Sequence, residues 1–209
     1  TDHSVTIAQM LKLKAYHTYM CGKWHIGEEE SSLPHNRGFD KSLVFLNGAT
    51  SYFNHEPYRD STWLDITGSI ELTTLLNGEE WTPPAEGYYT TDAWTDFAIR
   101  FIREDAGDDQ PFFLYMAYNA PHWPLHAKEE DIQKYLGKYD EGWSEIRRQR
   151  FEKQKELGIL PENCQLSPDD SKWLDWSEFN DSLKSRYSRK MAVHAAMIDC
   201  MDQNIGRIL

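Results

Sequence analysis

The sequence predicts an α/β fold in which buried parallel strands alternate with helices. Near the N-terminus, a helical pattern is followed by a short β-prone segment and then a loop containing glycine. Between residues 90 and 118, an amphipathic helical pattern leads into an uninterrupted apolar run, which is the order of half a βαβ crossover. No internal repeat and no low-complexity tract interrupts this organisation.

The first predicted helix runs from about residue 6 to residue 14. Thr6 and Gln9 have the spacing of a capping box, in which each side chain satisfies the other residue's backbone N–H. The apolar residues at helical spacing are Ala8, Leu11 and Ala15. A short strand is expected over residues 17–21, ending at Gly22.

Residues 28–87 are irregular, with Gly, Asn, Pro and Asp scattered between short β-prone pieces. Within them, residues 62–66 and 69–72 could form a hairpin around Thr67 and Gly68. The sequence therefore predicts a long connection here, with little regular structure of its own.

A clear amphipathic helix follows, with Thr90 or Thr91 as its predicted cap and Gly107 just past its end. Its apolar face consists of Trp94, Phe97, Ala98, Phe101 and Ile102. The apolar run 112–118 comes next, and its lack of alternation predicts a strand buried on both faces. It leads into loop 119–124, which two prolines make stiff.

The C-terminal half is predicted to be mainly helical. Residues 128–158 are charged, and acidic residues interleave the basic ones, which favours a solvated helical face over a binding patch. Residues 161–168 read as a loop, and a last helix is expected from about Glu178 to the end of the chain. Its expected stripe is Tyr187, Met191, His194, Ile198, Met201, Ile205 and Ile208.

Composition excludes some classes of function. The chain has 209 residues and a formal net charge of −12, whereas binding to phosphate backbones needs a basic surface, so a nucleic-acid partner is not expected. No apolar run approaches the roughly 20 residues that a membrane span requires. Cys21, Cys164 and Cys200 stand far apart without a CxxC pair, and we expect buried or incidental thiols. Both ends look cut, which predicts an internal piece of a longer polypeptide.

The first candidate site is the hexapeptide GKWHIG at residues 22–27. Its flanking glycines allow sharp turns, and they place a cation, Lys23, and an imidazole, His25, together at a strand end. Lys supplies a compact positive charge and His a donor that can be charged near neutral pH. The pair suits a tetrahedral oxyanion such as sulfate or phosphate, although such a hexapeptide can also be a surface turn.

The second candidate site is PHWPLH at residues 121–126. His122 follows a predicted strand, and ligands of open α/β sheets bind outside the carboxyl ends of strands. The spacing of His122 and His126 would suit a zinc pair only in a helix, and Pro124 argues against one. His122 is better interpreted as an acid, a base or an anion donor, the alternative being a loop hydrogen bond, and His126 as a supporting or surface residue.

The remaining polar residues give weaker signals. Asp199 and Asp202 could be metal ligands, but capping and ion pairs are commoner uses of helical aspartates. No HExxH pattern and no GxSxG serine motif occurs in the sequence. We therefore assign no metal ligand within the chain.

Together these segments resemble the sulfatase family of the alkaline phosphatase-like superfamily. The similarity is carried by TIAQML at 6–11, GKWHIG at 22–27, NAPHWPLHA at 119–127 and MIDCMDQNIGRIL at 197–209. The stretch 138–158 is similar to bacterial arylsulfatases in particular. These motifs span nearly the whole chain in the family's order. The resemblance implies a partial alkaline phosphatase-like sandwich, with a mixed, mostly parallel sheet flanked by helices, and residues 1–209 as an incomplete N-terminal catalytic domain truncated at both ends.

The resemblance also implies roles. Lys23 would contact the sulfate oxygens, His25 would hydrogen-bond the nucleophilic side chain, and His122 would bind the sulfate and could protonate the departing alcohol. The family's nucleophile is a formylglycine, made by a maturation enzyme from Cys or Ser in a C/S-x-P/A-x-R motif. A calcium ion held by Asp and Asn residues neutralises the ester oxygens.

The sequence departs from the family pattern at the nucleophile. No C/S-x-P/A-x-R motif occurs in the 209 residues, and the aspartates and the Asp-Asn pair expected to hold calcium are also missing. The resemblance implies that the formylglycine and the Ca²⁺ ligands lie outside this segment, which by itself should not turn over substrate.

Two alternatives to a sulfatase stay open. One is a phosphoric or phosphonic ester hydrolase of the same superfamily, and the other is an inactive relative that binds sulfated glycans. The expected ligand is a small-molecule or glycan sulfate ester, and Trp24, Tyr118 or Trp123 could stack on its ring. Family analogy favours a periplasmic or extracellular location.

Overall fold

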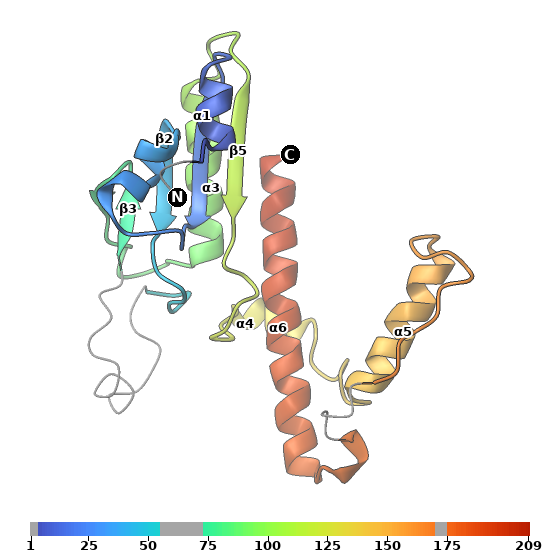
Figure 1. Ribbon diagram of the computed structural model, residues 1–209. Coiled ribbons are helices and arrows are strands. Elements are labelled where there is room, and N and C mark those ends of the chain that lie inside the picture. Colours follow the sequence, from blue (N-terminus) through green and yellow to red (C-terminus); the bar gives the residue numbers. More distant parts are fainter. Residues whose placement is uncertain (1–3, 55–72, 170–174) are drawn as a thin grey trace. The chain divides into compact units, whose positions relative to one another are not determined.

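The structure is a computed structural model that describes residues 4–54, 73–169 and 175–209 (Figure 1). The chain forms two compact units, one made of residues 1–126 and 198–209 and the other of residues 127–197. The hairpin predicted at 62–66 and 69–72 lies outside the described residues. None of the described helices is long and apolar enough to cross a membrane.

Within the described residues, five strands of the first unit form one mixed sheet in the order β4-β3-β2-β1-β5. The strands are β1 (His17–Lys23), β2 (Lys41–Phe45), β3 (Thr74–Leu76), β4 (Glu79–Glu80) and β5 (Phe112–Ala117). β1 is parallel to both β2 and β5, whereas β3 is antiparallel to β2 and β4 to β3. The predicted α/β class, with a mixed sheet flanked by helices, is confirmed.

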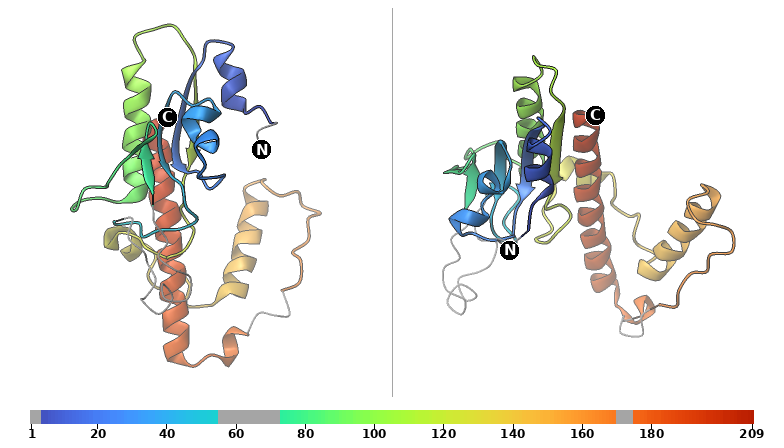
Figure 2. Two further views of the ribbon diagram at one scale, coloured as in Figure 1. Left: turned by 60° about the vertical axis from the view of Figure 1, so that its left-hand side comes forward. Right: turned by 45° about the horizontal axis from the view of Figure 1, so that its top comes forward.

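The two faces of the sheet carry separate apolar cores. The helix α1 (Ile7–Lys12) and the helix α3 (Thr90–Glu104) lie on opposite faces (Figure 2). The core on the α1 side contains Ala8, Met20, Trp24, Leu33, Phe39, Val44, Leu46 and Leu75. The core on the α3 side contains Tyr19, Cys21, Leu43, Phe45, Trp94, Ala98 and Phe101. Successive residues of β1 and β2 alternate between these cores, so both central strands are buried on two faces.

The capping box of α1 is confirmed. Thr6 Oγ1 accepts a hydrogen bond from the Gln9 N–H at 3.1 Å, and Gln9 Oε1 accepts one from the Thr6 N–H at 3.0 Å. The helix is shorter than predicted, since its C-cap is Leu13 and Ala15 has a φ of 58°, which no α-helix accommodates.

Helix α3 has the predicted apolar face, with Trp94, Ala98 and Phe101 at most 1% exposed. The predicted cap is wrong, because the N-cap is Tyr89, and both Thr90 and Thr91 lie in the first turn, fully buried. The Thr90 hydroxyl does not cap the helix; it donates a hydrogen bond to the Tyr52 carbonyl oxygen at 2.9 Å.

The prediction that residues 112–118 form a strand buried on both faces is wrong. β5 is at the edge of the sheet in the described part of the chain, where it pairs with β1. Phe112 and Tyr115 are 49% and 43% exposed. An apolar run without alternation fits a central strand, but strand order is a tertiary property that the run itself does not encode.

The predicted helical segment 128–158 consists of two helices, α4 (Glu129–Gln133) and α5 (Trp143–Glu156). The interpretation of its charges as a solvated face is confirmed, since no residue of α5 is buried. Arg148 forms an ion pair with Glu145 at 2.6 Å, and Lys153 forms one with Glu156 at 3.0 Å.

The last helix, α6, spans Asp181–Ile208 and starts three residues later than predicted. Part of its predicted apolar stripe is wrong, because Ile198 and Ile205 are 40% and 39% exposed. Small or polar residues four apart are buried instead: Ser188, Ala192, Ala196, Cys200 and Asn204.

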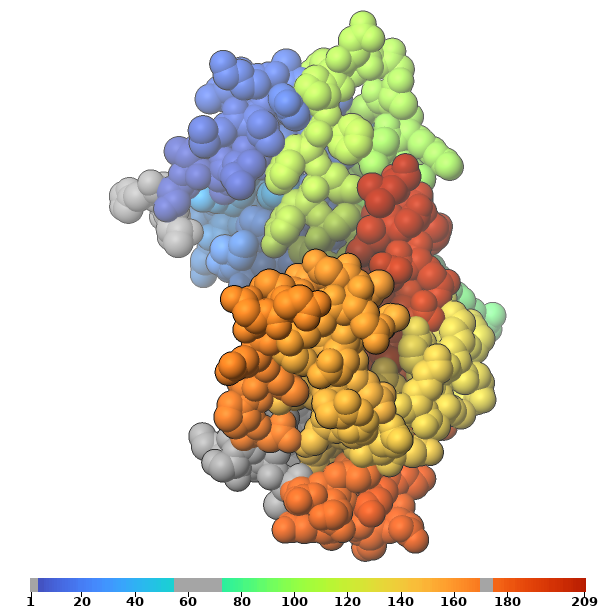
Figure 3. Space-filling view, turned by 90° about the vertical axis from the view of Figure 1, so that its right-hand side faces the viewer, coloured from blue at the N-terminus to red at the C-terminus, as the bar shows by residue number. Residues whose placement is uncertain are grey.

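The C-terminal turns of α6 belong to the first unit and lie against α3 and β5 (Figure 3). Asn204 Nδ2 donates to Asp92 Oδ1 of α3 at 2.8 Å, and the Cys200 thiol contacts the same oxygen at 3.7 Å. Cys21 and Cys200 are buried and Cys164 is half-buried, and no disulfide joins the three, as predicted.

Candidate anion-binding site

The parallel strands β1, β2 and β5 have their carboxyl ends on the same side of the sheet (Figure 1). We call this side, and not the position of the outermost strand β5, the edge. Lys23 is the last residue of β1 and lies beside Phe45 of β2, and Gly22 lies beside Ala117 of β5. The loops that follow β1, β2 and β5 therefore leave the sheet together. Lys23 ends β1, His25 is on the loop that follows it and His122 is on the loop after β5, so the fold brings both predicted motifs to one edge.

Gly22 allows β1 and β5 to approach closely at this edge. Its φ is 128°, a backbone conformation that residues other than glycine rarely adopt. A Cβ at this position would lie 2.1 Å from the carbonyl oxygen of Ala117. The glycine is thus required both by the backbone conformation and by the neighbouring strand.

Trp24 fixes the loop that carries His25. Its backbone N–H donates to Phe45 at 2.8 Å, and its indole Nε1 donates to the Ser32 carbonyl at 3.0 Å. Trp24 is only 6% exposed, so it does not provide the stacking surface that its position in the motif suggested. His25 has a φ of 48° and is exposed, with its ring against Gly48, where a Cβ would be 3.3 Å from Cε1.

Lys23 is half-buried, and burial lowers the pKa of its ammonium from the ordinary lysine value. Lys12 and Lys41, by contrast, form ion pairs with carboxylates, at 2.7 Å from Asp40 and 2.8 Å from Asp105 respectively. No carboxylate of the described residues pairs with Lys23. A partly desolvated cation without a counter-ion is stabilised when an anion binds beside it.

His122 is exposed on the loop after β5, and its ring is oriented by its neighbour. His122 Nδ1 is 2.6 Å from the carbonyl oxygen of Trp123, and the two rings stack with centroids 5.5 Å apart. Because a carbonyl oxygen can only accept, Nδ1 carries the hydrogen, which leaves Nε2 to act toward a ligand. Both peptide bonds preceding prolines in this loop, Ala120–Pro121 and Trp123–Pro124, are cis.

His126 is half-buried in the loop after β5 and contacts residues of two other segments. Its carbonyl accepts a hydrogen bond from the Tyr89 hydroxyl at 3.0 Å, and Nδ1 lies 3.5 Å from the Tyr52 N–H. Burial lowers its pKa below the ordinary histidine value. A neutral ring agrees with the acceptor role of Nδ1.

We predict that His126 makes the fold less stable in acid. Its folded-state pKa is lowered, so as the pH falls through about 6.5 the unfolded chain binds a proton that the folded chain resists. The free energy of unfolding should therefore fall on acidification, by less than about 1.4 kcal/mol per pH unit. Urea unfolding of the full-length gene product and its His126→Gln variant at pH 8 and pH 5.5 measures this. The wild type should lose more stability than the variant, and parallel losses would show the prediction to be wrong.

The other residues considered from the sequence differ in their surroundings. The Tyr118 hydroxyl lies 2.5 Å from Thr95 Oγ1, whereas Trp123 is 47% exposed beside His122. Asp199 accepts a hydrogen bond from Gln203 at 3.1 Å. In residues 4–54, 73–169 and 175–209, no three His, Cys, Asp or Glu side chains are grouped so that they could hold a metal ion.

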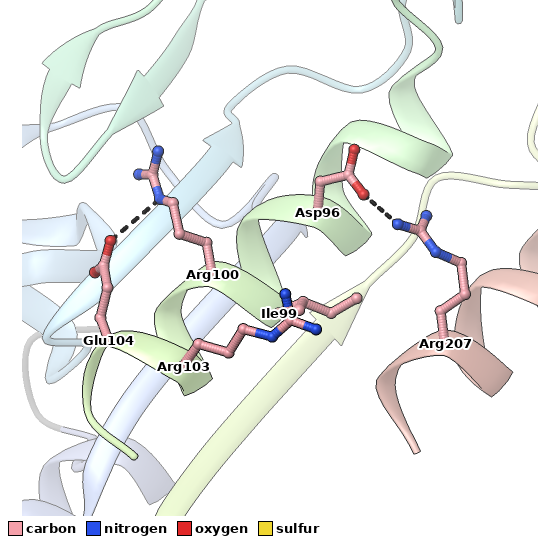
Figure 4. A pocket seen from close by; sticks show the side chains of 6 residues that line it. All are labelled: Asp96, Ile99, Arg100, Arg103, Glu104 and Arg207. Atoms are coloured by element: carbon pink, nitrogen blue, oxygen red, sulfur yellow. Dashed lines mark hydrogen bonds and ion pairs between the residues drawn. The ribbon is translucent and has the colours of Figure 1, made fainter. Parts of the chain in front are cut away.

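A surface pocket of about 650 Å³ lies elsewhere, between α3 and the end of α6 (Figure 4). It is lined by Asp96, Ile99, Arg100, Arg103, Glu104 and Arg207. Ion pairs join Arg100 to Glu104 and Arg207 to Asp96. Glu104 also contacts Lys41, the first residue of β2, so the pocket lies toward the opposite edge of the sheet from Lys23.

The structure is an α/β protein whose candidate oxyanion-binding residues, Lys23, His25 and His122, lie at or just after the carboxyl ends of its parallel strands. The chain belongs to the sulfatase family, whose Sulfatase domain matches residues 1–209. An arylsulfatase of Klebsiella aerogenes is 32% identical over 209 residues, covering all of this chain and 43% of that protein. An uncharacterized sulfatase of Schizosaccharomyces pombe is 32% identical over 218 residues, covering all of this chain and 37% of that protein.

Solved structures support the same fold. A protein named Ps i-CgsB, in complex with k-i-k-neocarrahexaose, superposes with a TM-score of 0.63 at 24% identity, over all of this chain and 36% of that one. Another, in complex with its substrate D-glucosamine-2-N,6-O-disulfate, superposes with a TM-score of 0.56 at 17% identity, over all of this chain and 46% of that one. The chain spans less than half the length of these relatives.

Proposed function

We propose that this chain supplies part of the active site of a sulfuric ester hydrolase. The observation that carries the proposal is Lys23, a half-buried cation that no described carboxylate neutralises, at the same sheet edge as His25 and His122. Membership of the sulfatase family supports sulfate as the anion. A half-buried cation near two imidazoles suits the transfer of a charged oxyanion, because such catalysis is mainly positioning and electrostatic stabilisation.

Each of the three residues has a role that its geometry permits. Lys23 contacts the sulfate oxygens and offsets their charge. His25, exposed at the end of β1, hydrogen-bonds the nucleophilic side chain. His122 binds the sulfate through Nε2 and, when its ring is protonated, donates that proton to the departing alcohol oxygen.

The nucleophile and the metal are proposed from the family resemblance. A formylglycine hydrate would supply the oxygen that attacks sulfur, and its C/S-x-P/A-x-R motif is absent from the 209 residues. Calcium prefers clustered oxygen ligands, and the described residues contain no cluster of acidic or other metal-binding side chains that would fit it. The roles proposed for Lys23, His25 and His122 do not depend on the ion.

The substrate class proposed is a sulfate ester of a ring-bearing alcohol, either an aryl compound or a glycan. Trp123 is the aromatic residue of the motif that is both exposed and next to His122, where it can stack on such a ring. A formylglycine-generating enzyme is the proposed maturation partner. A periplasmic or extracellular location is proposed by family analogy.

An assay of the full-length gene product tests the proposed function. We expect hydrolysis of 4-nitrophenyl sulfate or of a sulfated oligosaccharide with a kcat/KM at least about 100-fold above that for the matching phosphate ester. A preference for phosphate or phosphonate esters would favour the other hydrolase of the superfamily. Binding of sulfated glycans without hydrolysis, in a protein whose gene lacks the C/S-x-P/A-x-R motif, would favour an inactive binding protein.

A further inference from the structure

The loop after β2 reaches the loop that carries His122. Tyr52, in the first of these loops, is 0% exposed, and its hydroxyl donates a hydrogen bond to the carbonyl oxygen of His122 at 2.8 Å. Burial raises the pKa of this phenol further above its ordinary value, so the hydroxyl is protonated and can donate near neutral pH.

The backbone of Tyr52 is itself held on both sides. Its carbonyl accepts hydrogen bonds from the N–H of Thr90 at 2.8 Å and from the Thr90 hydroxyl at 2.9 Å. Its N–H points to Nδ1 of His126, and its ring contacts those of Tyr89 and His126, with centroids 5.9 Å and 6.4 Å away. Tyr52 thus links the start of α3 to the loop after β5.

We propose that Tyr52 is a positioning residue for His122. The chain of contacts has two steps: the Tyr52 hydroxyl fixes the backbone at His122, and the Trp123 carbonyl fixes the His122 ring through Nδ1. Tyr52 has no exposed surface with which to touch a substrate. The inference rests on the proposed function, because it assumes that His122 acts on the sulfate ester.

The physical reason is that His122 is exposed, so burial does not hold its ring in place. An exposed ring on a loop acts in catalysis only when the loop holds it within a fraction of an ångström of its working position. Removal of the Tyr52 hydroxyl leaves the ring contacts in place and removes the hydrogen bond to His122. The substitution Tyr52→Phe therefore separates positioning from packing.

The test compares Tyr52→Phe with Tyr19→Phe in the full-length gene product. Tyr19 is a matched control, since it is 1% exposed and its hydroxyl also makes a hydrogen bond, to Asp105 at 2.5 Å, near the opposite edge of the sheet. We expect Tyr52→Phe to lower kcat about tenfold on an alkyl sulfate. The loss should be smaller on 4-nitrophenyl sulfate, whose leaving group needs no proton, and KM and the Tyr19→Phe variant should stay near wild type.

Hydrogen–deuterium exchange provides a second readout that needs no activity. The amides of residues 119–126 should exchange faster in Tyr52→Phe than in the wild type, and Tyr19→Phe should leave them unchanged. Equal losses of kcat on both substrates, or unchanged exchange in this loop, would overturn the proposal. If the wild type hydrolyses no sulfate ester, the proposed function fails, while faster exchange at 119–126 would still support the positioning of His122 by Tyr52.

Discussion

Replacing Gly22 with alanine should destabilise the fold and strongly reduce turnover by the full-length gene product. The added Cβ would lie 2.1 Å from the oxygen and 2.4 Å from the carbon of the Ala117 carbonyl, both backbone atoms that cannot rotate away. The φ of 128° adds backbone strain. We expect the free energy of unfolding to fall by about 3–5 kcal/mol and kcat/KM to fall more than about 100-fold, because Lys23 ends β1 and the loop after β5 carries His122.

Two other glycines serve as controls for this substitution. Gly87 also has a positive φ, of 71°, but a Cβ there would meet nothing within 4 Å, so Gly87→Ala should cost only about 1 kcal/mol of stability. Gly107 has neither restriction, and Gly107→Ala should change stability by less than about 0.5 kcal/mol. Urea unfolding and kcat/KM of the three variants measure the series. If Gly22→Ala loses no more stability and activity than Gly87→Ala, β1 and β5 can move apart at little cost and the prediction is wrong.

The sequence predicts the first unit best where one local cause decides the structure. The capping box of Thr6 and Gln9 and the apolar face of α3 follow from spacing along the chain, and both are present. Thr90 fails as a predicted cap because its hydroxyl bonds to Tyr52, a residue 38 positions away. Capping preferences consider only the residues at the helix terminus, so they do not take account of a distant acceptor such as the Tyr52 carbonyl oxygen.

The candidate site also combines features with a local cause and features that depend on long-range packing. Glycines and polar residues after β-prone segments identified Lys23, His25 and His122 as candidates, and the fold places all three at one edge of the sheet. Tyr52 was missed, because it lies in the irregular residues 28–87 and no motif includes it. Its role depends on the packing of three chain segments, which a single sequence does not display. Trp24 and Trp123 were also indistinguishable until burial separated the buried indole from the exposed one.

Removal of the charge at Lys23 should have the second large effect. We expect Lys23→Met, which keeps an apolar stem of similar length, to lower kcat/KM for a sulfate ester by about 10²–10³-fold while the protein stays folded. The half-buried ammonium has no carboxylate partner among the described residues, so its loss leaves no uncompensated charge behind. Stability should therefore change little, and steady-state kinetics with urea unfolding measures both quantities.

The pH profile distinguishes a charge requirement from a shape requirement at Lys23. Burial lowers the pKa of this ammonium, so the charged form is lost as the pH rises through a value below 10.5, and activity should fall there. Lys23→Arg keeps its charge, and its residual activity should persist to higher pH. Lys41→Met is the matched control: its ammonium is paired with Glu104 and Asp105, so that variant should lose stability but retain kcat/KM. If Lys23→Met stays within about tenfold of wild type, a different cation binds the sulfate, because one lost charge-assisted contact in such a site costs more than that.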